Sequence, residues 1–452
     1  MKITAVVLAA GQGTRMKSEL PKMLHPVCGQ PMVFYALNAA RAASTEKPVV
    51  VIGHGADAVR KALGDSAECV VQENQLGTGH AVLQAEASLK EKTDYILVTY
   101  GDMPLLRVET LQKLVAAQQL NKGPISILTV THNNPRGFGR VLRNPDGTVV
   151  AIVEESQATS DQMLIKELNV GAYCFDAGWL WESLHRVQVS PKGEYFLTDT
   201  VELAVRAGLP VQAIEMDDFT ETIGVNTRIH LSEAEFAMRK RINEQHMLAG
   251  VTLIDPASTY IEAQVAIGQD TVIWPNTYLL GSTSIGENCQ IGPDSHLQST
   301  RIGNGCKVLM SVTEDAVLED HVDMGPFARL RKGAHLMSGV HMGNFGEVKD
   351  STLGPDVKMG HFSYIGNATI GANTNIGAGT ITCNFDGEKK HPTVIGENAF
   401  IGSDTMLVAP VTLGDGARTG AGAIVTKNVA PDTLVVGMPA RAIKKLEGRL
   451  KK

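Results

Sequence analysis

The chain shows two patterns of hydrophobic and polar positions, and the change between them falls near residue 250. In the first half, short apolar runs alternate with stretches of helical periodicity. The apolar runs lie at 2–10, 48–53 and 95–102, and the helical stretches at 31–43 and 80–90. Strands that alternate with helices predict crossover connections and a mostly parallel sheet. We therefore expect a Rossmann-like α/β domain over residues 1–227, with ligands at the carboxyl ends of its strands.

Residues 228–250 predict one charged amphipathic helix that links the two halves. Apolar positions on one face recur at helical spacing, at Leu231, Ala234, Met238, Ile242 and Ala249. No proline or glycine interrupts this pattern before Gly250.

From Ile261 the sequence repeats with a period of six, in hexads such as IGQDTV, IGENCQ and IGANTN. This period is typical of a hexapeptide β-helix. Each hexad forms one side of a triangular coil, with its aliphatic residue in the shaft and small residues at the corners. We predict a left-handed parallel β-helix domain over 251–452. The repeat is broken at 314–316 and at 382–394, where we expect loops outside the coils.

Composition and charge narrow the functional classes. A formal net charge of −7 argues against a general nucleic-acid-binding surface. The apolar run at 3–10 is about half the length that a membrane span needs, and it lacks the flanks of a signal peptide. Six cysteines without a C-x-x-C spacing favour free thiols over a zinc site or a disulfide framework. We expect a cytoplasmic protein without nucleic-acid partners or stable membrane insertion.

The segment LAAGQGTRMKSELPK, residues 8–22, predicts a phosphate-binding loop. Gly11 and Gly13 allow backbone N–H groups to approach phosphate oxygens, while Arg15 and Lys22 supply positive charge. The segment matches neither a P-loop nor the dinucleotide fingerprint. The alternative is a structural turn with solvated charges.

Two further segments fit a nucleoside triphosphate. Asp102 ends the apolar run at 95–102, where a carboxylate is well placed to hold Mg²⁺. The alternative is an aspartate that caps the following helix. A second Gly/Thr loop, at 72–81, suits the edge of a base.

With these motifs, L-x-x-G-x-G-T-R-M…P-K above all, the first half resembles the sugar-phosphate nucleotidyltransferases. Joined to a hexapeptide prism, residues 3–430 resemble the bacterial bifunctional N-acetylglucosamine-1-phosphate uridyltransferase/glucosamine-1-phosphate acetyltransferases. This family acetylates glucosamine-1-phosphate with acetyl-CoA and then transfers UMP from UTP, releasing pyrophosphate. Its product, UDP-N-acetylglucosamine, is a precursor of peptidoglycan and lipopolysaccharide. The resemblance also implies Mg²⁺ and a homotrimer.

The resemblance assigns residues of the first half to UTP and the UDP-sugar. Arg15 and Lys22 would be catalytic, and Asp102 and Asn226 would bind Mg²⁺. The residues around UTP and the sugar would be Leu8, Ala9, Ala10, Gly11, Lys22, Gln72, Gly77, Thr78, Tyr100, Gly101, Asp102, Gly139, Glu154, Asn169 and Asn226.

In the second half, His361 stands in a repeat whose inward positions are aliphatic. A lone histidine is more often structural, but a base of near-neutral pKa suits the attack of an amine on a thioester. The family assigns this role to His361. It assigns the sugar phosphate to Arg331, Lys349, Tyr364 and Asn375, and acetyl-CoA to Ala378, Asn384, Phe385, Ser403 and Ala421. Glu347 is a candidate to orient the amine or polarise His361.

The chain departs from the family at three positions. Phe385 replaces a tyrosine, Gly346 replaces an apolar residue and is expected to loosen its turn, and Met438 stands where an arginine is usual. Arg441 would then serve acetyl-CoA. The basic tail 441–452 is either a solvated end or a clamp on the CoA phosphates.

Two other readings keep the fold and change the function. One is a nucleotidyltransferase whose prism only regulates or trimerises, as in relatives of ADP-glucose pyrophosphorylase. The other is an assembly subunit without chemistry. Intact His361, Tyr364 and Asn375 argue against the first. The second is disfavoured by the intact residues of the first half, Arg15, Lys22, Asp102 and Asn226.

Overall fold

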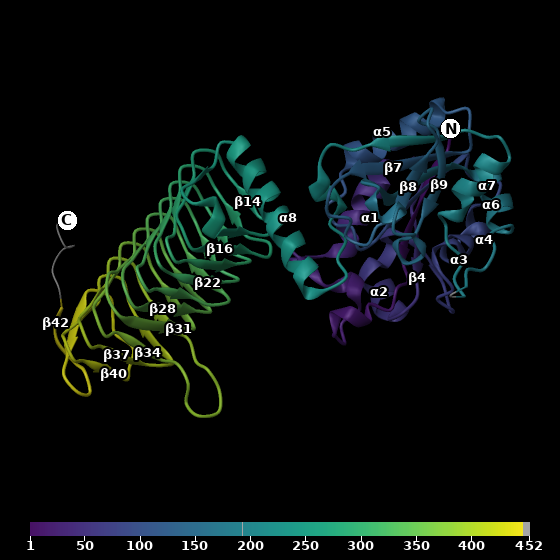
Figure 1. Ribbon diagram of the computed structural model, residues 1–452. Helices are drawn as coiled ribbons and strands as arrows, with labels where there is room; N and C mark the ends of the chain where they lie inside the picture. The colour runs from purple at the N-terminus through teal and green to yellow at the C-terminus, as the bar shows by residue number, and fades with distance from the viewer. Residues whose placement is uncertain (192, 446–452) are drawn as a thin grey trace. The chain divides into compact units, whose positions relative to one another are not determined.

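The computed structural model describes residues 1–191 and 193–445 of the chain. It divides into two compact units, Met1–Met238 and Arg239–Lys452. The first is an α/β unit and the second is a prism of stacked short strands (Figure 1). Both predicted fold classes are confirmed.

A central sheet with strand order β11-β7-β10-β6-β1-β4-β5 forms the α/β unit. The strands are β1 (Ile3–Ala9), β4 (Val49–Ile52), β5 (Glu68–Val71), β6 (Tyr95–Tyr100), β7 (Ile125–Thr131), β10 (Glu167–Asp176) and β11 (Val211–Glu215). Among these seven strands, all neighbouring pairs are parallel except those of β10, which runs antiparallel to β6 and β7. Two short strands, β8 (Arg140–Arg143) and β9 (Val149–Val153), join the sheet beside β10 and pair antiparallel. The sheet is therefore mostly parallel, as predicted.

Every residue of β1 is buried, because helices cover both faces of this sheet. Val7 and Ala9 pack into one hydrophobic cluster with Leu37 of α1 (Met32–Ala42). Val6 and Leu8 pack into a second cluster, which also holds residues of α3 (Thr78–Leu83) and α6 (Ala177–Leu184). A strand buried on both faces reads as a continuous apolar run, which is the pattern seen in the sequence.

Two details of the helices differ from expectation. The stretch 80–90 forms two short helices, α3 and α4 (Glu86–Leu89), because i→i+3 hydrogen bonds from Gln84 and Ala85 tighten the chain between them. Residues 228–250 contain α8 (Arg228–Leu248), in which Ala234, Met238 and Ile242 are buried. Ala249 follows the end of the helix and is exposed, so it does not extend the apolar face.

Three stacks of short strands build the β-helix, and all their pairs are parallel except the last pair of the first stack, which is antiparallel. Stack I runs from β12 (Thr252–Leu253) to β42 (Arg441–Lys445), stack II from β13 (Thr259–Ile261) to β40 (Ile424–Val425), and stack III from β14 (Ala266–Ile267) to β38 (Val411–Leu413). Residues that open hexads stack in register and are buried, as Ile273, Ile291 and Val308 are. Their side chains fill the shaft, as the six-residue period predicts.

Only one of the two predicted breaks forms a loop. At 314–316 the chain simply turns a tight corner between β22 (Val312–Glu314) and β23 (Val317–Leu318), with Asp315 in the left-handed region. The expected loop there is wrong, because a coil shortened by two residues keeps its stacking. The break at 382–394 does carry an excursion, closed by a bridge between Phe385 and Lys390.

All six cysteines are free thiols. In the described parts of the chain, no helix has the length and hydropathy to cross a membrane.

Candidate active sites

The loop after β1 is folded tightly against Lys22. Gly13 adopts the left-handed conformation with φ of 64°, and a Cβ atom there would lie 2.7 Å from Cβ of Lys22. Met16 N–H donates to the Gly13 carbonyl at 2.9 Å and starts a short 3₁₀ turn, Thr14–Met16. Arg15 is exposed on this turn. Glycine is thus required at 13 by both backbone angle and space.

Lys22, Asp102 and Asn226 meet at the carboxyl ends of β1 and β6. The ammonium of Lys22 lies 2.6 Å from Oδ2 of Asp102 and donates to Oδ1 of Asn226 at 3.2 Å. The side chains of Lys22 and Asp102 are 8% and 16% exposed. Val225 N–H donates to the Asp102 carbonyl at 2.8 Å and fixes Asn226 beside it. Residues from three distant segments therefore form one charged cluster.

A cavity of about 260 Å³ lies against this cluster. It brings together most residues predicted for UTP, and it also includes five residues that sequence reasoning did not single out. The lining is Leu8, Ala10, Gly11, Lys22, Met23, Gln72, Gln75, Gly77, Thr78, Ala81, Tyr100, Asp102, Glu194 and Phe196. Ala9 and Gly101 lie in or directly after β1 and β6, where Gly101 N–H donates to the Leu8 carbonyl.

The Gly/Thr loop forms one wall of the cavity. Gln72 donates through Nε2 to the Gly77 carbonyl at 3.1 Å, and the same atom lies 2.9 Å from Nδ1 of His80. Gly77 has φ of 102°, and a Cβ there would lie 2.6 Å from the Tyr195 carbonyl oxygen. Thr78 Oγ1 accepts from Leu197 N–H at 3.0 Å. His80, which orients the Gln72 amide, was not predicted because its partner depends on the fold.

The residues predicted for the sugar lie around Tyr100. Thr198 donates to Glu154 at 2.9 Å, and Asn169 donates to the Tyr173 hydroxyl at 2.6 Å. Burial raises the pKa of Glu154. Burial, with the carboxylates of Glu154 and Asp102, also raises the pKa of Tyr100, which therefore stays a neutral hydroxyl. Gly139 is tied to this group through its carbonyl, which accepts from Asn169 N–H.

The pair Asp102 and Asn226 suits a small divalent cation. In this structure their two oxygens hold a cation already, the Lys22 ammonium. A carboxylate and an amide oxygen match the oxygen preference of Mg²⁺, which completes its shell with water and substrate phosphates. Across 1–191 and 193–445, no cluster of three or more His, Cys, Asp or Glu could form an all-protein metal site.

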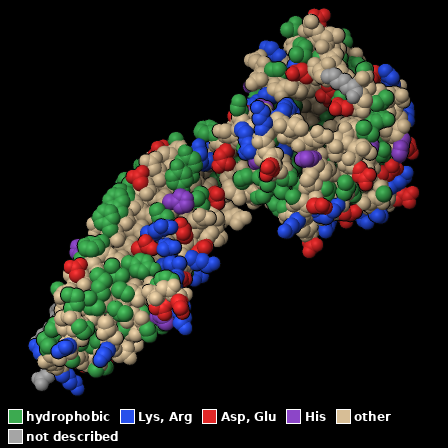
Figure 2. Space-filling view, turned by 90° about the horizontal axis from the view of Figure 1, so that it is seen from below, with side chains coloured by type: hydrophobic (Ala, Val, Ile, Leu, Met, Phe, Trp, Pro, Cys, Tyr) green, Lys and Arg blue, Asp and Glu red, His purple; other side chains and the backbone are tan. Residues whose placement is uncertain are grey.

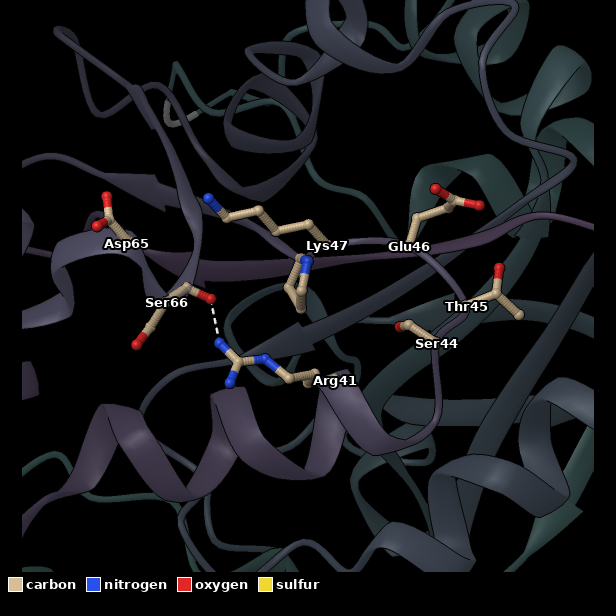
Figure 3. A pocket seen from close by; sticks show the side chains of 8 residues that line it. Arg41, Ser44, Thr45, Glu46, Lys47, Asp65 and Ser66 are labelled. Carbon is tan, nitrogen blue, oxygen red and sulfur yellow. Dashed lines mark hydrogen bonds between the residues drawn. The ribbon is translucent and has the colours of Figure 1, made fainter.

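A larger hollow lies elsewhere in the α/β unit. Arg41, Glu46 and Lys47 line a shallow depression of about 660 Å³ where β4 begins, with Arg41 donating to the Ser66 carbonyl (Figure 3). None of the described residues in it belongs to the predicted site. Parallel α/β sheets bind ligands at the opposite strand ends, so volume alone does not locate the site.

On the β-helix, one corner carries His361 and three residues predicted for acetyl-CoA. Strand register pairs Lys358 with Asn375, Asn375 with Phe400, and Phe400 with Arg418. Three positions later, the same register aligns one residue from each of four successive coils. This corner column consists of His361, Ala378, Ser403 and Ala421. His361 is exposed.

The residues predicted for the sugar phosphate flank this column. Arg331 donates to Glu347 at 3.0 Å, and Glu347 pairs in register with Tyr364. Glu347 therefore forms an ion pair with Arg331. Lys349 faces Lys390 of the excursion at 382–394. The side-chain hydrogen bond with Lys390, then the charges of Lys390 and Arg331, lower the pKa of Lys349. Lys390 was not predicted, because only the excursion brings it there.

Asn384 and Phe385 begin that excursion. Asn384 is 7% exposed and donates to Oδ1 of Asn367 at 2.7 Å, whereas Phe385 is 60% exposed. Asp386 accepts from the N–H groups of Glu388 and Lys389 and from His391, and these bonds hold its pKa well below its usual range. The loop is thus closed by its own carboxylate.

The other two positions at which the chain departs from the family, Gly346 and Met438, differ in burial. Gly346 is buried in β28 (Gly346–Lys349), and a Cβ there would lie 2.7 Å from Met359 Cε and 3.0 Å from Met342 Cε. Two methionines thus fill the space of the missing side chain, and the expectation of a loosened turn is wrong. Met438 is 74% exposed, and Arg441 is exposed in β42. The rest of the predicted basic tail, 446–452, lies outside the described residues.

Figure 2 shows a hollow in the α/β unit and, on the β-helix, a group of Lys and Arg side chains beside a hydrophobic area. Positive charge gathered on an otherwise acidic chain indicates an anionic ligand.

Comparisons with known proteins agree with these two units. The model of the MobA-like NTP transferase domain family matches residues 5–170, and that of the bacterial transferase hexapeptide family matches 264–299 and 392–427. Several relatives are each named bifunctional protein GlmU. That of Geobacillus sp. (strain WCH70) is 46% identical over 98% of this chain and 97% of its own. Those of Heliobacterium modesticaldum and Streptococcus agalactiae serotype III are each 45% identical, over 98% and 96% of this chain. The chain therefore belongs to the family of bifunctional GlmU proteins, the uridylyltransferase and acetyltransferase enzymes that its motifs resemble.

Proposed function

We propose that the β-helix acetylates glucosamine-1-phosphate with acetyl-CoA, and that the α/β unit then transfers UMP from UTP to the product. The observation that supports this most strongly is that each predicted residue set gathers within its own unit. The cluster of Lys22, Asp102 and Asn226 borders a cavity, and His361 lies on the corner column beside the cations.

In the first reaction the amine nitrogen attacks the thioester carbon, and a C–N bond forms as the C–S bond breaks. His361 accepts the proton that the amine loses, and CoA leaves as its thiol after protonation. A base of near-neutral pKa supplies about 10²–10⁴-fold. Arg331, Lys349 and Lys390 hold the sugar phosphate, with Tyr364 and Asn375 beside them. Ala378, Asn384, Phe385, Ser403, Ala421 and Arg441 contact acetyl-CoA.

In the second reaction an oxygen of the sugar phosphate attacks the α-phosphorus of UTP. The new P–O bond replaces the bond to the β-phosphate, and pyrophosphate leaves. Arg15 and Lys22 neutralise the charge on the phosphates, and positioning does the rest. Gln72, Gly77 and Thr78 hold the uracil, while Gly139, Glu154 and Asn169 hold the sugar. A Mg²⁺ ion held by Asp102 and Asn226 would supply further charge neutralisation.

The remaining features of the proposal concern assembly and location. Flat prism faces pack well side by side, so we propose a homotrimer with acetyltransferase sites between subunits. Six free cysteines suit a reducing compartment, in keeping with a cytoplasmic enzyme that supplies cell-wall precursors. The basic tail 441–452 remains a candidate clamp on the CoA phosphates.

A coupled assay on the full chain tests the proposal. Glucosamine-1-phosphate, acetyl-CoA, UTP and Mg²⁺ are combined, and free thiol and pyrophosphate are followed separately. Release of both is expected. Pyrophosphate only from added N-acetylglucosamine-1-phosphate, with no thiol, would show that the prism is a scaffold, whereas release of neither would contradict both activities.

A further inference from the structure

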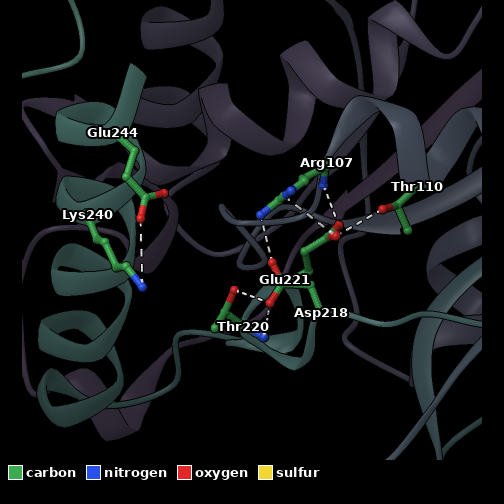
Figure 4. Close-up of polar contacts among 7 residues, drawn as sticks. All are labelled: Arg107, Thr110, Asp218, Thr220, Glu221, Lys240 and Glu244. Carbon is green, nitrogen blue, oxygen red and sulfur yellow. Dashed lines mark hydrogen bonds and ion pairs between the residues drawn. The ribbon is translucent and has the colours of Figure 1, made fainter. Parts of the chain in front are cut away.

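A buried carboxylate outside both sites ties together the two segments that carry Asp102 and Asn226. Glu221, in the short 3₁₀ turn Phe219–Thr222, is 3% exposed. Its Oε2 accepts from Arg107 N–H at 2.8 Å, and its Oε1 accepts from the Thr110 hydroxyl at 3.0 Å (Figure 4). Arg107 and Thr110 begin α5 (Val108–Leu120). The carboxylate thus caps a helix from a distant part of the sequence.

The two tied segments run in opposite directions. Asp102 stands five residues before Arg107, and Asn226 stands five residues after Glu221. At one end Val225 N–H donates to the Asp102 carbonyl at 2.8 Å, and at the other Glu221 holds the start of α5. These two attachments fix the register between the segments.

A carboxylate here suits its surroundings. It accepts from the N–H of Arg107 at the start of a helix, where negative charge is favoured. The neighbouring ion pair of Arg107 and Asp218, at 2.7 Å, is 45% and 33% exposed, so it contributes little to holding the segments. Glu221 also lines a hollow of about 240 Å³ with Arg107 and Thr110, which leaves room for the segments to shift once the carboxylate is gone.

We infer that Glu221 is a positioning residue, which holds Asp102 and Asn226 at the spacing that a divalent cation requires. The inference rests on the magnesium assignment proposed above. Groups that orient metal ligands affect the affinity for the metal, and Glu221 would do so indirectly, through the backbone of the two segments. It is not among the residues that line the cavity proposed for UTP.

The test is Mn²⁺ binding to the full chain with UTP present, measured from the electron paramagnetic resonance of free Mn²⁺. We expect Glu221→Ala to weaken Mn²⁺ binding by about tenfold or more. Binding of UTP without metal and acetyl transfer should stay as in the unchanged chain. The Mn²⁺ affinity of Glu221→Gln should stay close to that of the unchanged chain, because the amide can accept from Arg107 N–H and donate to the Thr110 hydroxyl.

Glu109→Gln is the matched control, since it removes an exposed carboxylate from the same helical turn. Unchanged Mn²⁺ affinity in a folded Glu221→Ala variant would overturn the inference. If that variant does not fold, Thr110→Val removes one hydrogen bond while keeping the shape, and about threefold weaker binding is expected. An unchanged affinity there overturns the inference equally. If the unchanged chain binds no Mn²⁺ with UTP, the metal assignment itself is wrong.

Discussion

The Lys22 ammonium and the Asp102 carboxylate are joined at 2.6 Å across 80 residues of sequence, and both side chains are largely buried. The same ammonium also donates to Asn226. A lysine therefore engages both oxygens that the proposed mechanism gives to Mg²⁺. Binding of Mg²⁺ and UTP would redirect this lysine from the two oxygens to the phosphates.

Lys22→Gln tests that exchange. We expect kcat/KM for UTP to fall about 10²-fold, because a charge on the phosphates is lost. Mn²⁺ binding with UTP present should not weaken, because the ammonium no longer competes for Asp102. The two quantities are measured by pyrophosphate release and by equilibrium metal binding. A parallel loss of metal affinity would show that Lys22 supports the cation rather than exchanging with it.

His361→Ala should lower acetyl transfer by about 10²–10⁴-fold and leave uridylyl transfer unchanged. Thiol release and pyrophosphate release on the same preparation separate the two. His341→Ala is the control, since that exposed histidine pairs with Asp323 in a neighbouring coil. A loss below about tenfold at position 361 would remove the base assignment.

Lys390→Ala should raise KM for glucosamine-1-phosphate by about tenfold at neutral pH, through the loss of a charged hydrogen bond. It should also raise the pKa of Lys349, which Lys390 and Arg331 lower. In the unchanged chain KM should therefore begin to rise at lower pH than in the variant. Measuring KM for glucosamine-1-phosphate as a function of pH gives both the rise in KM at neutral pH and the shift of its pH dependence. Lys389→Ala, which removes an exposed neighbouring charge, is the control. Identical pH profiles would contradict the coupling.

Asp199→Asn should flatten the pH dependence of α/β-unit stability. Burial, then Glu154 and Glu202, raises the pKa of Asp199 to about 6 from an ordinary value of 3.8. The folded state binds more protons than the unfolded state between these values, so the contribution of Asp199 to stability is lost as pH rises through about 4 to 6.

The measurement is thermal unfolding from pH 4.5 to 7.5, following the transition that UTP shifts upward. At pH 7.5 the variant should unfold roughly 2–4 °C higher than the unchanged chain, and the difference should shrink towards pH 4.5. A constant difference across this range would assign the effect to something other than ionisation.

Much of the architecture could be predicted because its causes are local. A hexad places Ile273 or Ile291 in the shaft whatever the rest of the chain does. The continuous apolar run of β1 indicates a strand that is covered on both faces of its sheet. The glycines of the phosphate loop are similarly local, since Gly13 meets Lys22 only nine residues away.

The interactions that could not be predicted join distant segments. Glu221 reaches Thr110 across 111 residues, and Lys390 meets Lys349 only because an excursion folds back over a coil. The shortened coil at 314–316 looked like a loop, because sequence spacing does not reveal that a corner tolerates fewer residues. The sequence at Gly346 indicates only a missing side chain, because it does not reveal that Met342 and Met359 fill the space.

The corner column has a consequence for the length of the acyl donor. Successive coils are spaced by about 4.8 Å, so His361 and Ala421, three coils apart, are separated by roughly 14 Å along the prism. The residues that follow His361 in this column, Ala378, Ser403 and Ala421, all have small side chains. In the proposed acetyl transfer, a donor with a long, slender arm would extend along this column while its thioester reached the histidine. A truncated thioester would contact only the coil of His361 and would lose the contacts with the following three coils.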